Sequence, residues 1–273
     1  PNGNQTTYEG VALGKKLYYD PILSNNGNSC ATCHENNTSF TTYNSNSIPH
    51  INEGWNNVFL WNGGVEGTLE DAMHFEVYEF FKTDVSKINT NQTYRNLFKQ
   101  VYNIDEISGD DIAKALAQYF RSLVSVNSVF DQYLQRKTML TLSELNGFFI
   151  FNSEKGECFH CHSIGLFQDN TFHNIGIDSV FEAENVGRYL ITQNMSDLGK
   201  FKTPTLRNIE LTAPYMHDGR FQTVEQVVEH YNSGVKKSNT LDPIMSKSSF
   251  EFGLQLTAQQ KSDLISFLKA LTD

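Results

Sequence analysis

The apolar residues of this chain recur at helical spacing in several separate stretches. Five of these stretches begin at two polar residues three positions apart, the pattern of a capping box, in which each side chain satisfies a backbone amide of the other residue. The pairs are Thr68 with Asp71, Ser108 with Asp111, Thr141 with Glu144, Thr223 with Gln226, and Thr257 with Gln260. The pattern therefore predicts that helices begin at these five points.

The apolar stripes after these caps indicate which faces of the helices are buried. The stripes are Leu69, Ala72 and Met73; Ile112, Leu116, Phe120, Leu123 and Val124; Val224, Val227, Val228 and Tyr231; and Leu264, Ile265, Leu268 and Leu271. A further stripe before Pro21 contains Val11, Gly14, Leu17 and Tyr18. Since no sustained alternation of apolar and polar residues predicts strands, we expect a mainly α fold.

Long polar segments separate these helices, so we also expect long loops, notably at residues 35–57 and 163–210. A helix ending near Gln135 is expected to close a first domain, which gives domains of residues 1–137 and 138–273. Residues 147–151 echo residues 14–18. This weak internal repeat predicts that the second domain is built like the first.

One five-residue pattern occurs twice, as Cys30-Ala31-Thr32-Cys33-His34 and as Cys158-Phe159-His160-Cys161-His162. Cysteines three apart share a helix face, so both thiols can reach one edge of a porphyrin, and the following histidine can bind the iron. The two runs use all 4 cysteines of the chain. We therefore expect two covalent c-type haems, one per domain, rather than a zinc site or free redox thiols.

Composition narrows the choice of partners. The formal charge of −10 argues against nucleic acid, which selects basic surfaces, and is compatible with a small protein electron donor steered by charge. Uninterrupted apolar runs, such as residues 148–151, are too short to cross a bilayer. Haem is normally attached to cysteine outside the cytoplasm. We therefore expect an exported, periplasmic bacterial protein in its mature form.

The chain resembles the bacterial di-haem cytochrome c peroxidases and their MauG-type relatives over nearly its whole length. The resemblance is carried by residues 13–21, by Trp61-Asn62-Gly63, and by residues 203–208 and 211–221. It implies two cytochrome c-like domains. Peroxide would react at the N-terminal haem, and a six-coordinate C-terminal haem would relay electrons.

The resemblance also suggests the sixth ligand of the second haem. The peroxidases have a methionine fourteen residues after the position of His217, where this chain has Tyr231, as MauG-type proteins do. Tyr231 shares a helix face with Val224, Val227 and Val228, whereas His230 is turned away by about 100°. A core tyrosine is the alternative, with Met216, His217, His230 or Met245 as the ligand instead.

At the first haem, the family uses a glutamate about twenty residues beyond its tryptophan to move a proton between the peroxide oxygens. Glu79 fits this count with gaps, and Glu76 is the rival because it shares a face with the apolar stripe of its helix. The resemblance identifies Trp61 as the aromatic residue between the haems, a role for which Trp55 has no such support. A glutamine that often lines this pocket is replaced by Ala72 or Met73.

Many of these peroxidases place a histidine on the distal iron until the other haem is reduced. The corresponding loop, residues 40–46, contains no histidine, so we expect a first haem that is open without reductive activation. Binding of His50 to this iron is the alternative, and His74 is a more remote candidate.

Two supporting roles also follow from the resemblance. Calcium would be bound by Asn46, or by Ser47, together with Thr212 and Pro214, through the oxygen ligands that calcium prefers. Arg207 would pair with a haem propionate, and a surface salt bridge is its alternative role.

Three functions are compatible with these features. The first is reduction of hydrogen peroxide to water by electrons that a small cytochrome or copper protein delivers to the C-terminal haem, which passes them to the N-terminal haem. The second is a MauG-type oxidase that modifies a partner protein, which Tyr231 and the missing histidine favour. The third is a non-catalytic di-haem electron carrier, which would need two closed irons. A homodimer is one option for the assembly.

Overall fold

The computed structural model describes residues 3–41, 46–246 and 253–273. These residues form two compact units. The N-terminal unit comprises Pro1–Asn36, His50–Phe59 and Val65–Val124, and the C-terminal unit comprises Asn37–Pro49, Leu60–Gly64 and Ser125–Asp273. The change of unit thus falls after Val124, whereas we expected it after Lys137.

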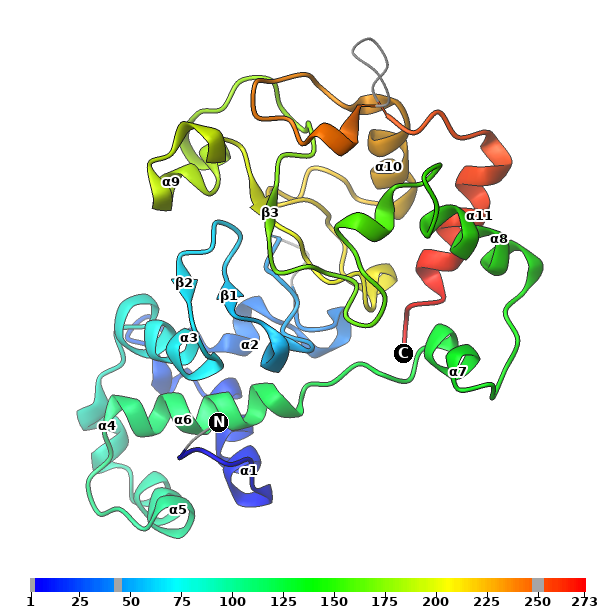
Figure 1. The fold of residues 1–273 in the computed structure, drawn as a ribbon. Coiled ribbons are helices and arrows are strands. Elements are labelled where there is room, and N and C mark those ends of the chain that lie inside the picture. The colour runs from blue at the N-terminus through cyan, green and yellow to red at the C-terminus, as the bar shows by residue number, and fades with distance from the viewer. Residues whose placement is uncertain (1–2, 42–45, 247–252) are drawn as a thin grey trace. The chain divides into compact units, whose positions relative to one another are not determined.

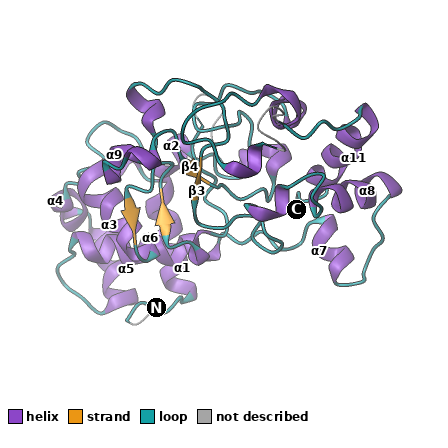
Figure 2. Cartoon of the chain, turned by 45° about the horizontal axis from the view of Figure 1, so that its top comes forward, coloured by secondary structure: helices purple, strands orange, loops and turns teal. Residues whose placement is uncertain are grey.

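The N-terminal unit is helical apart from one short ladder (Figures 1 and 2). Its α-helices are α1 (Tyr8–Tyr19), α2 (Cys30–Cys33), α3 (Leu69–Phe75), α4 (Val85–Thr90), α5 (Gln92–Tyr102) and α6 (Gly109–Ser122). A π-helical segment, Glu76–Phe80, continues α3. Strands β1 (Val58–Phe59) and β2 (Val65–Glu66) pair antiparallel, with Val58 opposite Glu66.

The C-terminal unit repeats this composition. Its α-helices are α7 (Val129–Leu134), α8 (Leu142–Phe151), α9 (Tyr189–Thr192), α10 (Val224–Glu229) and α11 (Ala258–Lys269). A second π-helical segment, His230–Gly234, continues α10. Strands β3 (Phe172–His173) and β4 (Phe201–Lys202) pair antiparallel, with Phe172 opposite Lys202.

Short 3₁₀ helices connect these elements. They are Pro21–Leu23, Asn36–Thr38, Glu53–Trp55, Cys158–His160, Ala183–Val186, Met195–Asp197, Ile209–Leu211 and Pro243–Met245. None of the described helices combines the length and the apolar character that a bilayer-spanning helix needs.

The five predicted capping boxes are all present, at the N-termini of α3, α6, α8, α10 and α11. The helix expected to end near Gln135 is present as α7, which ends at Leu134, but it does not close the N-terminal unit. Helix α6 ends at Ser122, and a separate helix, α7, precedes Gln135. Phe130 of α7 packs against Phe267 of α11 at a centroid distance of 5.1 Å, so α7 belongs to the C-terminal unit.

Each unit is centred on two helices that cross at a glycine. A Cβ on Gly14 of α1 would lie 2.0 Å from the Ala115 carbonyl oxygen of α6, and a Cβ on Gly147 of α8 would lie 2.0 Å from the Asp263 carbonyl oxygen of α11. Only glycine permits so close an approach of two helix backbones. The residues four positions later, Tyr18 and Phe151, are both fully buried. The structure thus confirms the internal repeat.

Candidate functional site

The second cysteine-histidine run holds its histidine in the orientation of an iron ligand. His162 Nδ1 donates to the Phe167 carbonyl oxygen at 2.8 Å, which leaves Nε2 available. A hydrogen bond of this kind fixes the tautomer and ring plane of a metal-binding histidine. Burial lowers the pKa of His162 to about 4, so the ring is neutral, as a ligand must be.

An apolar cavity lies beside His162 in the C-terminal unit. Both cysteines of the run line it, and so do Val224, Val227, Val228 and Tyr231 from the α10 segment. A cavity with two cysteines and a neutral histidine in an apolar wall fits a covalently bound flat macrocycle.

Several of the proposed sixth ligands face this cavity. Tyr231, Met216, His217 and Met245 line it. His230 does not belong to the lining, and its Nε2 is hydrogen-bonded to the Ile175 carbonyl oxygen at 3.0 Å. The apolar stripe of α10 therefore brings Tyr231 into the cavity and turns His230 away, as the helical spacing predicted.

His217 carries a buried polar atom in the wall of this cavity. Its ring stacks on Phe201 at 3.6 Å, and its Nε2 is hydrogen-bonded to Asn185 Oδ1 at 2.9 Å. Within the described part of the chain, His217 Nδ1 is buried without a hydrogen-bond partner. A buried nitrogen of this kind is costly unless a bound group satisfies it.

Two charged residues in the cavity wall were not expected from the sequence. Lys202 is buried, and its Nζ donates to Gln168 Oε1 at 3.0 Å. His173 is hydrogen-bonded to Asp169 at 2.8 Å and to Asp242 at 2.6 Å. Hydrogen bonds, first with Asp169, raise the pKa of His173 to about 11. The charge of Lys202 suits the acidic edge of a haem, whereas that of His173 is offset by its two carboxylate partners. A sequence signal existed for Lys202, which directly precedes the motif at 203–208.

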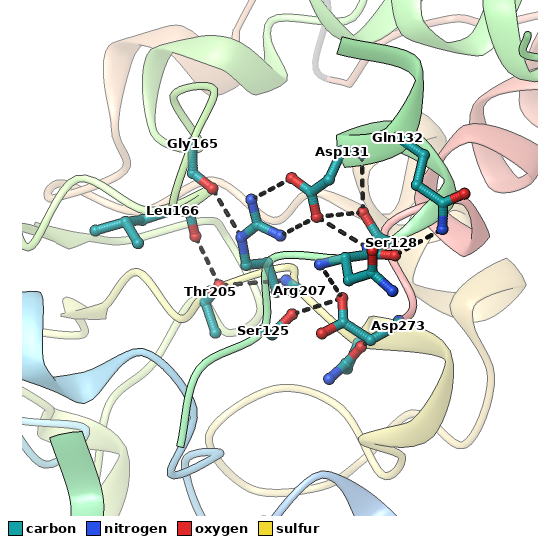
Figure 3. Close-up of polar contacts among 11 residues, drawn as sticks. Ser125, Ser128, Asp131, Gln132, Gly165, Leu166, Thr205, Arg207 and Asp273 are labelled. Carbon is teal, nitrogen blue, oxygen red and sulfur yellow. Dashed lines mark hydrogen bonds and ion pairs between the residues drawn. The ribbon is translucent and has the colours of Figure 1, made fainter. Parts of the chain in front are cut away.

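Arg207 forms an ion pair inside the C-terminal unit. Its Nη atoms donate to both carboxylate oxygens of Asp131, at 2.8 and 2.9 Å, and its Nε donates to the Gly165 carbonyl oxygen at 2.8 Å (Figure 3). The pair is buried rather than on the surface. Arg207 is therefore engaged by a carboxylate of the protein itself, and its pairing with a propionate stays a prediction.

Trp61 lines the same cavity, although it precedes the second cysteine-histidine run by about a hundred residues. Its indole N–H donates to the Asn46 carbonyl oxygen at 2.8 Å, and its own carbonyl accepts from the Lys202 amide at 2.8 Å. These two hydrogen bonds hold the indole against the wall of the C-terminal cavity. Trp55, in contrast, is exposed.

The first cysteine-histidine run forms α2, which begins at a capping box of Ser29 and Thr32. Cys30 is buried and Cys33 is exposed. His34 follows α2, and the His50 ring stacks on its ring with a centroid distance of 3.3 Å and an angle of 17°. If His34 binds a haem iron, a ring stacked on His34 lies on the same face of that haem as His34. This position argues against His50 as a ligand on the opposite face.

The two candidate glutamates differ in position. Glu76 is half-buried at the end of α3, whereas Glu79 is exposed. Burial raises the pKa of Glu76 to about 7. After burial itself, the charge of Glu76 is the largest cause of the raised pKa of Cys30, so Glu76 lies near the haem-attaching cysteine. The geometry thus favours Glu76 over Glu79 at the first haem.

Glu76 and Tyr231 occupy equivalent positions in the two units. Each is the eighth residue after a capping threonine, Thr68 in the first unit and Thr223 in the second. Each also lies in the π-helical segment that continues the capped helix. π-helical segments are frequent at functional sites. The equivalence places Glu76 where the second unit has its candidate iron ligand.

The calcium candidates lie in one region of the C-terminal unit. A Cβ on Gly219 would be 3.1 Å from Pro214 Cγ and 3.7 Å from Asn46 Cβ. The Asn46 side-chain amide contacts the Met216 carbonyl oxygen. Thr212, two residues before Pro214, is buried. The alternative ligand, Ser47, has its carbonyl oxygen hydrogen-bonded to Thr41 Oγ1.

Known proteins are similar to this chain in sequence and in architecture. Residues 8–139 match the family model of di-haem cytochrome c peroxidase. The methylamine utilization protein MauG of Methylophilus methylotrophus is 31% identical, and the match covers 99% of this chain and 84% of that protein. This chain belongs to the di-haem cytochrome c peroxidase and MauG family.

Other members of the family confirm the match. Cytochrome c551 peroxidase of Nitrosomonas europaea is 31% identical over 95% of this chain and 79% of its own. The crystal structure of a MauG-like protein associated with microbial copper homeostasis superposes with a TM-score of 0.90 and 31% identity, covering 100% of this chain and 92% of that one. Membership makes the chain an oxidoreductase that acts on peroxide and implies two haem cofactors.

Proposed function

We propose that this enzyme reduces hydrogen peroxide at the haem of the N-terminal unit and, as MauG-type proteins do, draws the electrons from a partner protein whose aromatic side chains it oxidises. The observation that carries the proposal is Tyr231, which lines the same cavity as His162. A phenolate is a hard anionic ligand that stabilises ferric iron more than a thioether does. Such a centre suits the storage of oxidising equivalents.

We assign the iron ligands accordingly. His34 would bind the first iron and leave its opposite face open, whereas His162 and Tyr231 would close the second. The haems, attached through Cys30, Cys33, Cys158 and Cys161, supply the redox chemistry and polarise the bound peroxide. Electrons would enter at the second haem and pass the indole of Trp61 on the way to the first.

Glu76 would carry the proton that peroxide cleavage requires. Its carboxylate would accept a proton from one peroxide oxygen and donate it to the other, which would leave as water. A carboxyl whose pKa is about 7 can do both near neutral pH, because it gains and loses a proton at similar cost. Ala72 and Met73 are buried on the same helix, so Glu76 stands in an apolar setting.

A calcium ion held by Asn46, Thr212 and Pro214 would stabilise the loop that fixes Trp61. Asn46 supports this proposal because its carbonyl accepts the indole N–H of Trp61. The side-chain oxygen and nitrogen of an asparagine are assigned from their surroundings, and a cation would turn the oxygen inward. We further propose the periplasm as the location, because haem is attached to cysteine there.

A second candidate is peroxidase activity supported by a small cytochrome or copper protein. Met216 and Met245 also line the second cavity, and ligation by either would give the methionine-bound relay of the peroxidases. The peroxidase of Nitrosomonas europaea is among the relatives, which also favours this candidate.

The Tyr231→Met variant, with wild type as reference, separates the two. If Tyr231 binds the iron, a redox titration of the second haem will give a higher midpoint potential in the variant, since a thioether favours ferrous iron. Electron paramagnetic resonance of the ferric wild type should show one high-spin and one low-spin haem. An unchanged potential, together with rapid steady-state oxidation of reduced cytochrome c by peroxide, would favour the peroxidase instead.

A further inference from the structure

A continuous series of aromatic rings leads from His34 to the surface of the N-terminal unit. The His34 ring stacks on His50, and the Tyr18 ring contacts His50 edge-on at a centroid distance of 6.0 Å. The Tyr18 ring also contacts Tyr19, at 5.1 Å. Tyr18 is fully buried, whereas 42% of Tyr19 is exposed. The series therefore begins at the expected ligand of the first iron and ends in solvent.

Hydrogen bonds hold this series in place. The Tyr18 hydroxyl lies 3.0 Å from the His34 carbonyl oxygen and 3.2 Å from His50 Nδ1. One arrangement satisfies both contacts, with His50 Nδ1–H donating to Tyr18 and Tyr18 donating to the carbonyl. At the outer end, Tyr19 shares a hydrogen bond with the buried Tyr119, whose ring is 5.1 Å from that of Tyr18. The three tyrosines and His50 are thus fixed relative to His34.

Packing alone does not require oxidisable rings at these positions. The matching crossing of α8 and α11 in the C-terminal unit is filled by phenylalanines, such as Phe151, Phe167 and Phe267. The N-terminal unit instead uses three phenols, Tyr18, Tyr19 and Tyr119. Phenols can be oxidised by one electron with loss of a proton, whereas phenylalanine cannot under the same conditions.

We propose that Tyr19 is a surface redox site of the first haem, reached through His50 and Tyr18. This inference rests on the proposed reaction of peroxide at that haem. Tyr19 loses one electron to the peroxide-oxidised haem and releases its phenolic proton to water, which leaves a neutral tyrosyl radical. An external one-electron donor then supplies an electron, and water returns the proton, so Tyr19 is restored.

The site would give the oxidising equivalents of peroxide a second exit. Peroxide removes two electrons in one reaction, and a partner that yields one electron at a time, or no partner at all, leaves an excess. Passage to an exposed phenol lets a small phenolic reductant at the surface remove that excess without entering the haem pocket.

The test is electron paramagnetic resonance of enzyme frozen soon after mixing with hydrogen peroxide without reductant. We expect an organic radical whose signal narrows when the protein is produced with ring-deuterated tyrosine. Tyr19→Phe should abolish the signal. Tyr8→Phe is the matched control, because Tyr8 is 87% exposed on the same helix and about 16 Å away along its axis. His50→Leu should lower the radical yield while leaving Tyr19 intact.

Three results would overturn the inference. They are a radical of full intensity in Tyr19→Phe, an unchanged yield in His50→Leu, and the absence of a radical although the haem absorption spectrum shows that peroxide has oxidised the enzyme. If peroxide leaves the haem spectrum unchanged, the proposed function fails first, and the tyrosine site falls with it. The haem spectrum thus distinguishes the two failures.

Discussion

Single residues make the two haem sites different. The N-terminal unit has Glu76 at the position where the C-terminal unit has Tyr231, eight residues after a capping threonine in each case. A carboxyl with a pKa of about 7 is suited to proton transfer, and a half-buried phenol in an apolar cavity is suited to closing an iron. The chemistry assigned to each unit therefore depends on one side chain at one helical position.

Replacement of Glu76 by Gln should slow peroxide consumption by about 10²–10⁴-fold, because general acid–base catalysis contributes about that much. The control, Glu79→Gln, should stay near the wild-type rate, since Glu79 is exposed. A stopped-flow assay at equal haem content measures both.

The wild-type rate should rise with pH through about 7, as Glu76 loses its proton and becomes a base, whereas the Gln variant should lose this step. A reversed order of the two variants would identify Glu79 as the proton carrier.

The buried pair of Arg207 and Asp131 makes a prediction about stability. Arg207→Met would leave a buried carboxylate without its partner, at a cost of about 3–5 kcal/mol in the free energy of unfolding. Lys261→Ala, which breaks a more exposed pair with Glu229, should cost at most about 1 kcal/mol. Urea unfolding followed by circular dichroism measures both, and equal small losses would contradict the assignment.

The pair also predicts the direction of a pH effect. Burial alone would raise the pKa of Asp131, but the hydrogen bonds from Arg207 and Ser128 hold it below the ordinary value. A lowered carboxyl pKa stabilises the fold above the unfolded pKa, and this stabilisation is lost as the pH falls through the folded value. The difference in stability between wild type and Arg207→Met should therefore shrink as the pH falls through the folded-state pKa of Asp131, which urea unfolding at several pH values measures.

At the scale of elements, the sequence predicted the features that depend on residues close together in the chain. The five capping boxes each depend on residues three apart, so their pattern sufficed to locate α3, α6, α8, α10 and α11. The repeat of residues 14–18 at residues 147–151 likewise predicted that the two units are built alike, and the structure has a close helix crossing at the glycine of each.

Features that depend on distant residues escaped prediction. Arg207 finds Asp131, seventy-six positions away, and no local pattern indicates that pairing. The stack of His50 on His34 joins two loops, and the preference for Glu76 over Glu79 depends on which side of a π-helical segment faces the interior. A count of residues from Trp61 could not take that local change of helical period into account.

The two helix crossings predict the effect of a single methyl group. Gly147→Ala would place a carbon 2.0 Å from the Asp263 carbonyl oxygen, so α8 and α11 must separate, at a cost of roughly 1–3 kcal/mol. Gly54→Ala is the control, because its nearest neighbour, Arg121 Cγ, would lie at an ordinary 3.5 Å. Thermal unfolding of both variants followed by circular dichroism, which reports on both units, measures the difference, and equal melting temperatures would argue against the tight crossing.

At the scale of the whole molecule, each unit carries its own haem-attachment run. The second cavity is lined entirely by residues of the C-terminal unit, including Trp61 from its inserted segment Leu60–Gly64. The two haems should therefore be acquired independently. The formal charge of −10, to which the propionates add, favours a partner with a basic surface.

Mass spectrometry of a Cys30→Ser, Cys33→Ser double variant should show one attached haem rather than two, with the absorption of the second haem retained. The reciprocal variant, Cys158→Ser with Cys161→Ser, is the matched control and should retain the first haem. Loss of both haems in either variant would mean that the units do not mature separately.

The shared place of Glu76 and Tyr231 also bears on how such enzymes arise. Duplication of a one-haem ancestor would yield two electron-transfer domains, each with a six-coordinate iron that cannot bind an oxidant. Replacement of the distal ligand in one copy by a carboxylic acid would open that iron and supply a proton donor at the same time. An electron-transfer domain would thus become a catalytic one through a single substitution.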